Sequence, residues 1–502
     1  MPLPAKLCEK PYLKTMTQPK SNSEIPAGPA GADPKQHLLH LSRMKETLER
    51  TTIPLLGLSE PTISAAGTRR LHEDYPMATQ QSEAHIRPVE DIVLEYADFV
   101  RAQRKAQPDQ PQVELPLLVQ YDLYHLAEAM PETRAGAPHD TLHSFFHRQE
   151  AVDTILDHCQ YFLDRQGLIM LMWHTYHPAW EDLDFYRITN QTGTYSPVVF
   201  DDTMNNPFNM MHLPDALSRA MQQNIIKQTI DELVGAKYAS RLTLSFRKKL
   251  DHIADFAKAL ARRNGSAIFR PYHEHSPGNW FWWCLDNLSD DPNEAARLYR
   301  KLFHQTRVYL EQQGVDNLLY CYSPDLPYQR PFTNKADFLE HYHRGMPDIE
   351  QVDVLGLDAY LWKLFTADDQ QDYADASARA NEEQCYDILA RPWERALQIC
   401  TWLREEYPDK IVGLTETGWN YQKWGDLEEK PIETFWQEVG TERVLFLEPQ
   451  ERPHFLCLWR NDIGDRYCPW NNGSPRFAEE ATALANALVT YTADVPKEPP
   501  VI

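Results

Sequence analysis

The sequence has little positive charge and no long apolar run. Lysine and arginine together number 50, against 73 aspartate and glutamate residues, so the formal net charge is −23. Binding to a phosphate backbone or to an anionic membrane surface depends on clustered lysine and arginine, so this balance argues against nucleic acid and membrane as partners. No segment has the length of a signal peptide's apolar region or of a bilayer span. We therefore expect the chain as given to stay in the cytoplasm, or to be secreted if a native leader has been removed.

Motifs for metals and cofactors are also missing. The eight cysteines stand at irregular spacings without a CxxC pair, which gives a structural zinc site or a redox motif little support. No GxGxxG or P-loop signature indicates a nucleotide. His273, Glu274 and His275 are adjacent, so on an extended strand they point to alternating faces, and they lack the HExxH spacing of a helical metalloprotease. The sequence predicts neither a metal nor a cofactor.

The two ends of the chain differ in composition from its middle. Residues 1–36 are rich in proline, serine and glycine and lack periodicity, which is typical of a disordered leader or linker. Residues 493–502 read as a flexible tail for the same reason. Hydrophobic residues make up 42% of the chain, enough for a substantial core, and we expect one folded domain over residues 37–492 that acts as a monomer.

Eight short apolar runs alternate with helical patterns, as parallel strands joined by crossover helices do. The runs are 53–59, 115–123, 168–174, 266–274, 317–324, 352–360, 410–418 and 454–461. Eight such units predict an α/β fold, the (β/α)₈ TIM barrel, in which catalytic residues lie at the C-terminal ends of the strands. One predicted helix begins near Phe246, with Ser245 as its N-cap and Gly265 at its end. Residues 178–240, after the third strand, are too many for a simple loop and predict an excursion beside the active face.

One of the runs ends in Glu274, another carries Glu416 near its end, and a third carries Asp358 near its end. Glycoside hydrolysis commonly uses such a carboxyl pair, one to protonate the leaving oxygen and one to attack the anomeric carbon or activate water. Aromatic rings pack against the apolar faces of sugars, and they are frequent beside these carboxylates. They are Trp280, Phe281, Trp282 and Trp283 after Glu274, Tyr360 and Trp362 after Asp358, Trp419 after Glu416, and Trp459 at the end of the eighth run. Trp280 is the favoured sugar platform, whereas one of Trp282 and Trp283 could be core, and Trp362 and Trp419 could be either.

At these residues the chain resembles glycoside hydrolase family 26, whose best-known members are β-mannanases. The segment RPYHEHSPGNWFWW, residues 270–283, is similar to the family's Arg-Pro-x-His-Glu segment and the Trp-Phe-Trp-Trp that follows it. TETGW, residues 415–419, looks like the family's nucleophile segment. Four more segments resemble family segments and occur in the same order: MWHTYHP, LLYCYSPD, VLGLDAY and FLCLWRN.

This resemblance implies a retaining enzyme in which Glu274 is the acid/base and Glu416 the nucleophile. It also implies that His273 contacts the sugar or the nucleophile, that Tyr360 hydrogen-bonds Glu416, and that Asp358 helps to organise these groups. The residues that would line the sugar sites are His174, Trp280, Trp459 and Arg460. The family needs no metal for its chemistry, and its partner is a polysaccharide or oligosaccharide substrate.

We therefore expect a retaining glycoside hydrolase that cleaves β-1,4-mannosidic bonds. Two alternatives stay open at this point. The link 275–279 carries one residue more than the family's usual link, and a proline, which leaves room for mixed-linkage β-glucan or β-1,3-xylan as the substrate. A protein of another class, a non-catalytic polysaccharide-binding protein, could keep the same scaffold.

Overall fold

The protein was analysed as a computed structural model, which describes most of residues 218–459 and parts of the chain before and after them. The described residues are 36–50, 55–59, 118–123, 148–164, 167–175, 177–178, 218–276, 281–328, 331–419, 435–459, 461–462 and 465–466. The predicted leader and tail lie outside these ranges, except that Gln36 begins the first helix.

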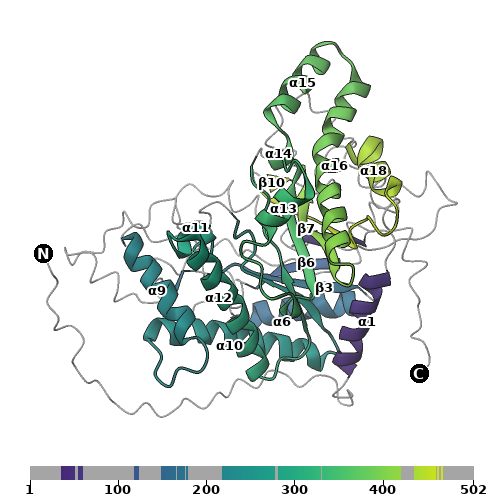
Figure 1. The fold of residues 1–502 in the computed structure, drawn as a ribbon. Helices are drawn as coiled ribbons and strands as arrows, with labels where there is room; N and C mark the ends of the chain where they lie inside the picture. Colours follow the sequence, from purple (N-terminus) through teal and green to yellow (C-terminus); the bar gives the residue numbers. More distant parts are fainter. Residues whose placement is uncertain are drawn as a thin grey trace, which may run out of the picture.

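Eight parallel strands pair in chain order, and the first also pairs with the eighth, so the sheet closes into a barrel (Figure 1). The strands are β1 (Leu55–Ser59), β2 (Leu118–Asp122), β3 (Leu168–Trp173), β4 (Ala267–Pro271), β5 (Leu318–Tyr322), β6 (Val354–Tyr360), β7 (Ile411–Gly418) and β8 (Phe455–Leu458). Each strand lies within the apolar run that predicted it, which confirms the (β/α)₈ barrel. A short antiparallel pair, β9 (Asn461–Asp462) and β10 (Asp465–Arg466), follows β8.

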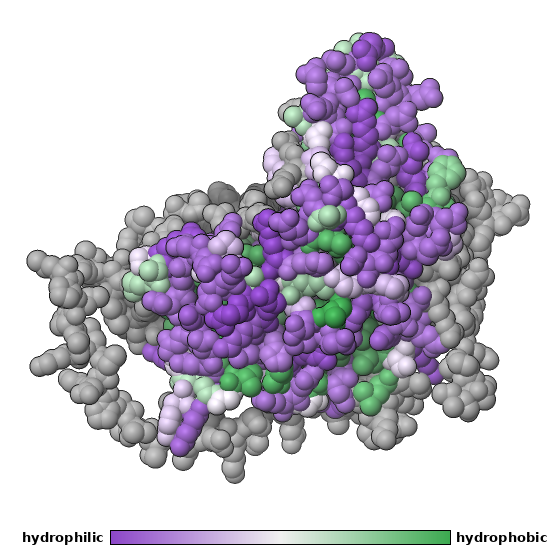
Figure 2. Space-filling model, in the orientation of Figure 1, coloured by the Kyte–Doolittle hydropathy of each residue, from purple (hydrophilic) through white to green (hydrophobic). Residues whose placement is uncertain are grey.

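Helices follow the strands and cover the barrel, while α15 and part of α16 project from it as a pair (Figure 1). The helices are α1 (Gln36–Arg50), α6 (Arg148–Leu163), α9 (Arg219–Glu232), α10 (Arg241–Arg262), α11 (Leu285–Leu288), α12 (Pro292–Gln312), α13 (Lys335–Tyr342), η4 (Ile349–Gln351), α14 (Leu361–Leu364), α15 (Ala367–Ala378), α16 (Glu382–Glu406), η5 (Trp436–Gly440) and α18 (Thr441–Phe446). Among the described residues, no helix is both long enough and apolar enough to cross a membrane. The helix surface that Figure 2 shows is mostly hydrophilic, as expected for elements that bury only one face.

Two details of the region before β4 differ from the sequence prediction. Ser240, and not Ser245, caps α10, because its hydroxyl accepts a hydrogen bond from the Thr243 N–H at 3.2 Å. At the other end Asn264 takes the left-handed backbone conformation, with φ of 62°. Gly265 serves packing instead, since a Cβ there would lie 2.6 Å from Cδ1 of Leu163.

The predicted excursion 178–240 is in part a helix. Its last third forms α9, whose N-cap is Ser218, followed by a short turn into α10. Helix α9 packs against α10, α11 and α12, so this part belongs to the helical cover of the barrel and does not form a loop beside the active face. Residues 179–217 of the excursion lie outside the described residues.

The barrel interior contains two layers of different chemistry. The lower layer is apolar and consists of Leu118, Leu168, Met170, Ile268, Leu319, Cys321, Val354, Ile411, Phe455 and Cys457, with Met44 and Leu48 of α1 beneath it. Side chains two residues apart on a strand share a face, so positions two or four residues further along also point inward. These positions form a buried polar upper layer: Gln120, Asp122, Arg270, Ser323, Asp358 and Thr415. The upper layer lies at the C-terminal ends of the strands, where a barrel of this kind places its chemistry.

Candidate active site

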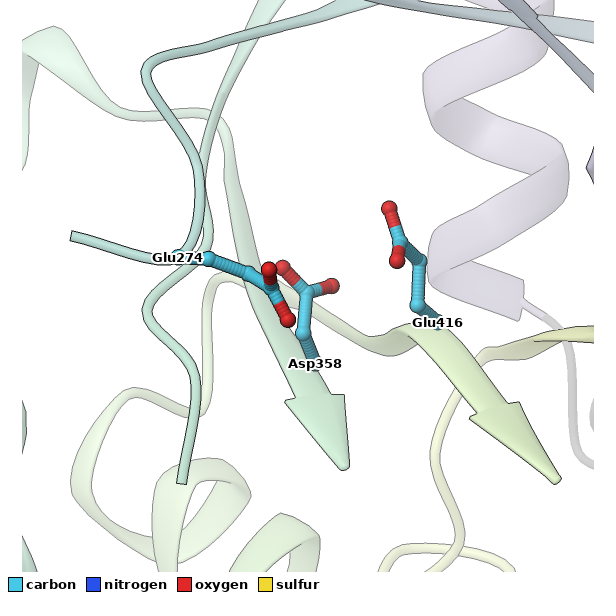
Figure 3. Close-up of side chains that lie close together, drawn as sticks. All are labelled: Glu274, Asp358 and Glu416. Carbon is cyan, nitrogen blue, oxygen red and sulfur yellow. The ribbon is translucent and has the colours of Figure 1, made fainter. Parts of the chain in front are cut away.

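Three carboxylates meet at the C-terminal end of the barrel. Glu274 follows β4, Asp358 lies on β6 and Glu416 on β7, and one oxygen of each lies within 4.8 Å of one oxygen of the others (Figure 3). The structure thus brings together the two glutamates that the sequence singled out, although they are far apart in the chain. The strand order produces this cluster, because β6 pairs with β7 and only β5 separates β4 from β6.

A β-bulge in β7 aims Glu416 into the barrel. Leu357 of β6 pairs with Leu414, but the next residue, Asp358, pairs with Glu416, so Thr415 is an extra residue in β7. As a result two consecutive side chains reach the interior, since the Thr415 hydroxyl donates to Asp358 at 2.7 Å while Glu416 contacts Arg270 of β4. Strict alternation would have pointed one of the two outward, and bulges commonly re-aim side chains beside active sites.

Glu416 is buried and held by a donor at each oxygen. Nη2 of Arg270 donates to its Oε1, and the Tyr360 hydroxyl donates to its Oε2. Burial raises the pKa of Glu416, whereas the Arg270 guanidinium and the Tyr360 hydrogen bond favour the ionised form and oppose that rise. The side chain of Glu416 is therefore fixed in orientation and compensated in charge.

Asp358 and Arg270 form a fully buried ion pair beneath Glu416. Nη1 of Arg270 lies 2.7 and 2.8 Å from the two Asp358 oxygens, and the hydroxyl of Ser323 donates to Asp358 at 3.1 Å. Burial raises the pKa of Asp358, and Arg270 opposes this. Burial alone would lower the pKa of Arg270, but the two carboxylates raise it overall, so this arginine stays charged. Asp358 thus contacts the arginine that also holds Glu416, while its predicted role in organising the groups around Glu416 stays a prediction.

Arg270 is a site residue that sequence reasoning did not assign. Its position carried a signal, because an arginine within the apolar run AIFRP must be buried and therefore needs an anionic partner. Asp122 was missed as well, although it ends β2, much as Asp358 lies near the end of β6.

Glu274 stands in a strained loop at the mouth of the barrel. Both Glu274 and Tyr272 have positive φ, 52° and 55°, in the left-handed region that non-glycine residues rarely occupy. The Glu274 N–H donates to the Ser323 carbonyl at 3.0 Å, which holds the turn in place. Such strain is often found where a functional side chain must be aimed. The Glu274 side chain is 15% exposed, and it pairs with Lys363, whose Nζ lies 3.2 Å from its Oε1.

Two histidines line the same mouth. His174 binds Asp122 through its ring Nδ1, and its backbone N–H donates to the other Asp122 oxygen at 3.2 Å. His273 packs edge-on against His174, with ring centroids 4.3 Å apart, and its Nε2 lies 3.8 Å from Oε1 of Glu416. Burial and the Arg270 charge hold the pKa of His273 well below its usual value, so the ring is neutral. Within the described ranges neither ring nitrogen of His273 has a hydrogen-bond partner.

The aromatic residues divide between site and core. Tyr360 and Trp459 pack with Met172 at the mouth, and Trp362 stacks on Tyr360 with ring centroids 6.2 Å apart. The other tryptophans near the carboxylates are fully buried: Trp282, Trp283 and Trp419. Trp282 donates to the Thr175 carbonyl and Trp283 to the His273 carbonyl, so both brace the loops beneath the site. Two predicted substrate contacts, Trp280 and Arg460, lie outside the described residues.

The three clustered carboxylates could in principle surround a cation, since oxygen ligands at this spacing suit a hard metal ion. Each of them already contacts a protein cation, however. Arg270 forms ion pairs with Asp358 and Glu416, and Lys363 forms one with Glu274. A metal ion would have to displace or repel these side chains, so we assign no metal ligands here.

The fold and the site define a (β/α)₈-barrel protein with a pair of glutamates at the C-terminal mouth. Residues 144–384 match the model of glycosyl hydrolase family 26, a stretch that includes Glu274, Asp358 and Tyr360. This part of the chain is therefore similar to that family.

Curated relatives and solved structures are also similar to parts of the chain or to its fold. A mannan endo-1,4-beta-mannosidase of Bacillus subtilis is 40% identical over 113 residues, and one of Bacillus subtilis (strain 168) is 38% identical over 118 residues. These matches span 22% and 23% of this chain and only 28% and 29% of the relatives' length. GH26C from Muricauda sp. MAR_2010_75 superposes with a TM-score of 0.53 at 19% identity, covering 91% of this chain and 95% of that one. The catalytic domain of the Bacillus sp. JAMB-750 GH26 endo-beta-1,4-mannanase gives a TM-score of 0.51 at 17% identity, covering 92% and 91%. At these identities the structural likeness concerns the fold.

Proposed function

We propose that the chain is a retaining glycoside hydrolase that cleaves β-1,4-mannosidic bonds in mannan or manno-oligosaccharides. The observation that carries the reaction type is the approach of Glu274 and Glu416, with oxygens within 4.8 Å of each other. Retaining enzymes hold their two carboxyl groups about 5–5.5 Å apart, whereas inverting enzymes leave about 6.5–9.5 Å for a water molecule. The choice of mannan is supported by the names of the curated relatives, both of which are mannan endo-1,4-beta-mannosidases.

In the first step Glu416 attacks the anomeric carbon while Glu274 gives its proton to the leaving oxygen. The environments of the two residues suit this division of roles. Arg270 and Tyr360 fix Glu416 as an oriented anion, whereas Glu274 stands at the partly exposed edge of the site, where a leaving group can depart. The result is a glycosyl-enzyme intermediate on Glu416.

In the second step Glu274, now a carboxylate, takes a proton from the water that displaces the sugar from Glu416. The Arg270 and Tyr360 contacts again favour the reaction, because they stabilise the carboxylate that Glu416 becomes on leaving. His273 lies beside this carboxylate and packs against His174, and both histidines are candidates for contact with sugar hydroxyls. Arg270 cannot reach the sugar face while it is bound to two carboxylates, so its role is to position Glu416.

The proposal is tested by offering the purified protein mannan, mixed-linkage β-glucan and β-1,3-xylan and measuring reducing-end release. We expect release from mannan, with the new reducing ends first appearing as the β-anomer in proton NMR. Release from glucan or xylan alone would contradict the substrate, and α-anomeric products would contradict the mechanism. Binding to mannan without any release would mean that the scaffold is a binding module.

A further inference from the structure

Lys363 is a buried lysine at the edge of the carboxylate cluster. It lies on α14, directly after β6, and only 9% of its side chain is exposed. Its Nζ lies 3.2 Å from Oε1 of Glu274 and 3.4 Å from Oδ2 of Asp325. Its charge also lies 5.1 Å from the centroid of the Tyr360 ring. Lysines are rarely buried unless they are paired, so two carboxylates share this one cation.

Asp325, the second partner, is buried in the loop that follows β5. Its backbone bridges to Asp358 of β6, which places the carboxyl beside the cluster. Oδ2 faces Lys363, while Oδ1 has no hydrogen-bond partner within the part of the chain that the structure describes. Burial raises the pKa of Asp325 to about 6, Lys363 opposes the rise and Glu274 adds to it. Burial alone would lower the pKa of Lys363, but Glu274 and Asp325 outweigh burial and raise it.

We infer that Lys363, shared between Glu274 and Asp325, is a positioning residue that stabilises the Glu274 carboxylate left when Glu274 gives up its proton. The inference rests on the proposed function and goes beyond it. An acid/base must exist in two states during one catalytic cycle, and a buried lysine with two possible partners accommodates both.

Sharing keeps the lysine paired at every stage. While Glu274 holds its proton, Asp325 alone balances Lys363. As the glycosidic C–O bond breaks and Glu416 bonds to the anomeric carbon, the proton passes to the leaving oxygen, and the new Glu274 carboxylate pairs with Lys363. In the second step water gives a proton to Glu274 while its oxygen bonds to the carbon and the bond to Glu416 breaks. Lys363 keeps its own protons throughout.

Other charged groups around Glu274 do not take over this role. The groups that face it are Lys363, Asp325, Asp358 and Glu416, with the Cys284 thiol beside its backbone carbonyl. Arg270 is already bound to Asp358 and Glu416. Lys363 is therefore the cation that contacts Glu274 among the described residues, and removing it leaves Glu274 among carboxylates.

Two substitutions should act in opposite directions. Lys363→Met removes the cation, so proton loss from Glu274 becomes harder and the basic limb of the kcat/KM profile on mannan moves to higher pH. Asp325→Asn removes the competing anion, so Lys363 serves Glu274 alone and the basic limb moves to lower pH. We expect each shift to be about one pH unit or more, a tenfold change in an ionisation constant. Lys363→Arg, which keeps the charge, should stay near the wild-type profile.

A measurement without substrate separates this inference from the proposed function. In protein labelled with ¹³C at glutamate carboxyls, the Glu274 signal, assigned through Glu274→Gln, should titrate with its midpoint raised in Lys363→Met and lowered in Asp325→Asn. Lys301→Met, which breaks the outer ion pair with Asp231, is the matched control and should not move it. Opposite shifts support the inference even if no polysaccharide is cleaved. Unchanged midpoints, or shifts of the same sign in both variants, overturn it even if mannan is cleaved. If Lys363→Met does not fold, the midpoint of the Glu274 signal in Asp325→Asn is the test: a lowered midpoint supports the inference, and an unchanged or raised one overturns it.

Discussion

The lower and upper layers of the barrel interior are built from the same strands but follow opposite rules. On β4, Ile268 belongs to the apolar lower layer and Arg270, two residues on, to the charged upper layer. On β6, Val354 and Asp358 are divided in the same way. The lower layer stabilises the folded state because it removes apolar surface from water. In the upper layer, ion pairs and hydrogen bonds must compensate the cost of burying charge.

The two layers of the barrel interior therefore have different roles. A buried ion pair is weak evidence for stability, because apolar residues of similar size often stabilise a core as well or better. The charges of the upper layer are therefore best explained by chemistry, and the lower layer with α1 beneath it by stability. Substitutions in the upper layer should abolish activity, and those in the lower layer should change stability while leaving the activity of the folded molecule intact.

The largest effect is expected at the two glutamates. Glu416→Ala removes the attacking group and should lower kcat on every substrate by about 10⁴-fold or more. Glu274→Ala should lower mannan cleavage by about 10²–10⁴-fold, but an aryl mannoside, whose phenolate leaves without protonation, should still react in the first step.

The two variants are separated by pre-steady-state kinetics with azide. Glu274→Ala should show a burst of phenolate and then stall as glycosyl-enzyme, because water lacks its base, and azide should restore turnover with retained configuration. Glu416→Ala should show no burst. Azide products of inverted configuration from Glu274→Ala would contradict the assignment of the two roles.

The next largest effect is expected for Arg270→Met in the upper layer. Methionine has similar length but leaves Asp358 and Glu416 buried without their cation, so we expect a loss of about 3–5 kcal/mol in the free energy of unfolding. Activity should fall too, because Glu416 loses its orientation. Denaturant titration measures the first effect and mannan cleavage the second. The control is Arg297→Met, which breaks an exposed pair with Glu294 and should cost about 0–1 kcal/mol. An equally small loss in Arg270→Met would mean that the upper layer tolerates its charges unpaired.

The sequence predicted the fold well for a physical reason. Strands buried on both faces must be short, apolar and separated by helices, so all eight were visible as runs. Glu274 and Glu416 were visible because a carboxylate at the end of such a run is unusual, and because the surrounding segments resemble those of a known family. The strands and the two glutamates could be predicted because each depends on a pattern within a few neighbouring residues.

The features that the sequence did not reveal depend on contacts between distant segments. The bulge at Thr415 is defined only by its register with β6. Lys363 and Asp325 received no role from the sequence, since nothing local shows that Glu274 lies beside them. The N-cap of α10 was assigned to Ser245 because the apolar stripe begins there, but Ser240 starts the helix a full turn earlier, with Glu232 accepting from its N–H at 2.6 Å.

A smaller effect is expected for Gly413→Ala on β7, whose neighbour Phe455 belongs to the lower layer. A Cβ at this position would lie 2.4 Å from the Phe455 ring, so the ring must shift within a packed core. Overpacking of this kind costs about 1–3 kcal/mol. Unfolding by denaturant measures the loss, and the double variant Gly413→Ala/Phe455→Leu should recover part of it because leucine relieves the contact. A loss in the single variant that the second substitution does not reduce would show that the strain is not in this contact. The activity per folded molecule should remain that of the wild type.

The smallest effect, and the sharpest comparison, is expected for Ile268→Val, two residues before Arg270 on the same strand face. Valine removes one methylene from a fully buried lower-layer side chain, which should cost about 0.5–1.5 kcal/mol of unfolding free energy. Because the backbone and β-branching are preserved, Arg270 should keep both carboxylate partners, and kcat and KM on mannan should be unchanged. The measurement is a denaturant titration alongside steady-state kinetics at a temperature well below the unfolding transition. If kcat falls several-fold while unfolding changes little, the lower layer must help to position the ionic network, and the division between a stabilising layer and a chemical layer is wrong at β4.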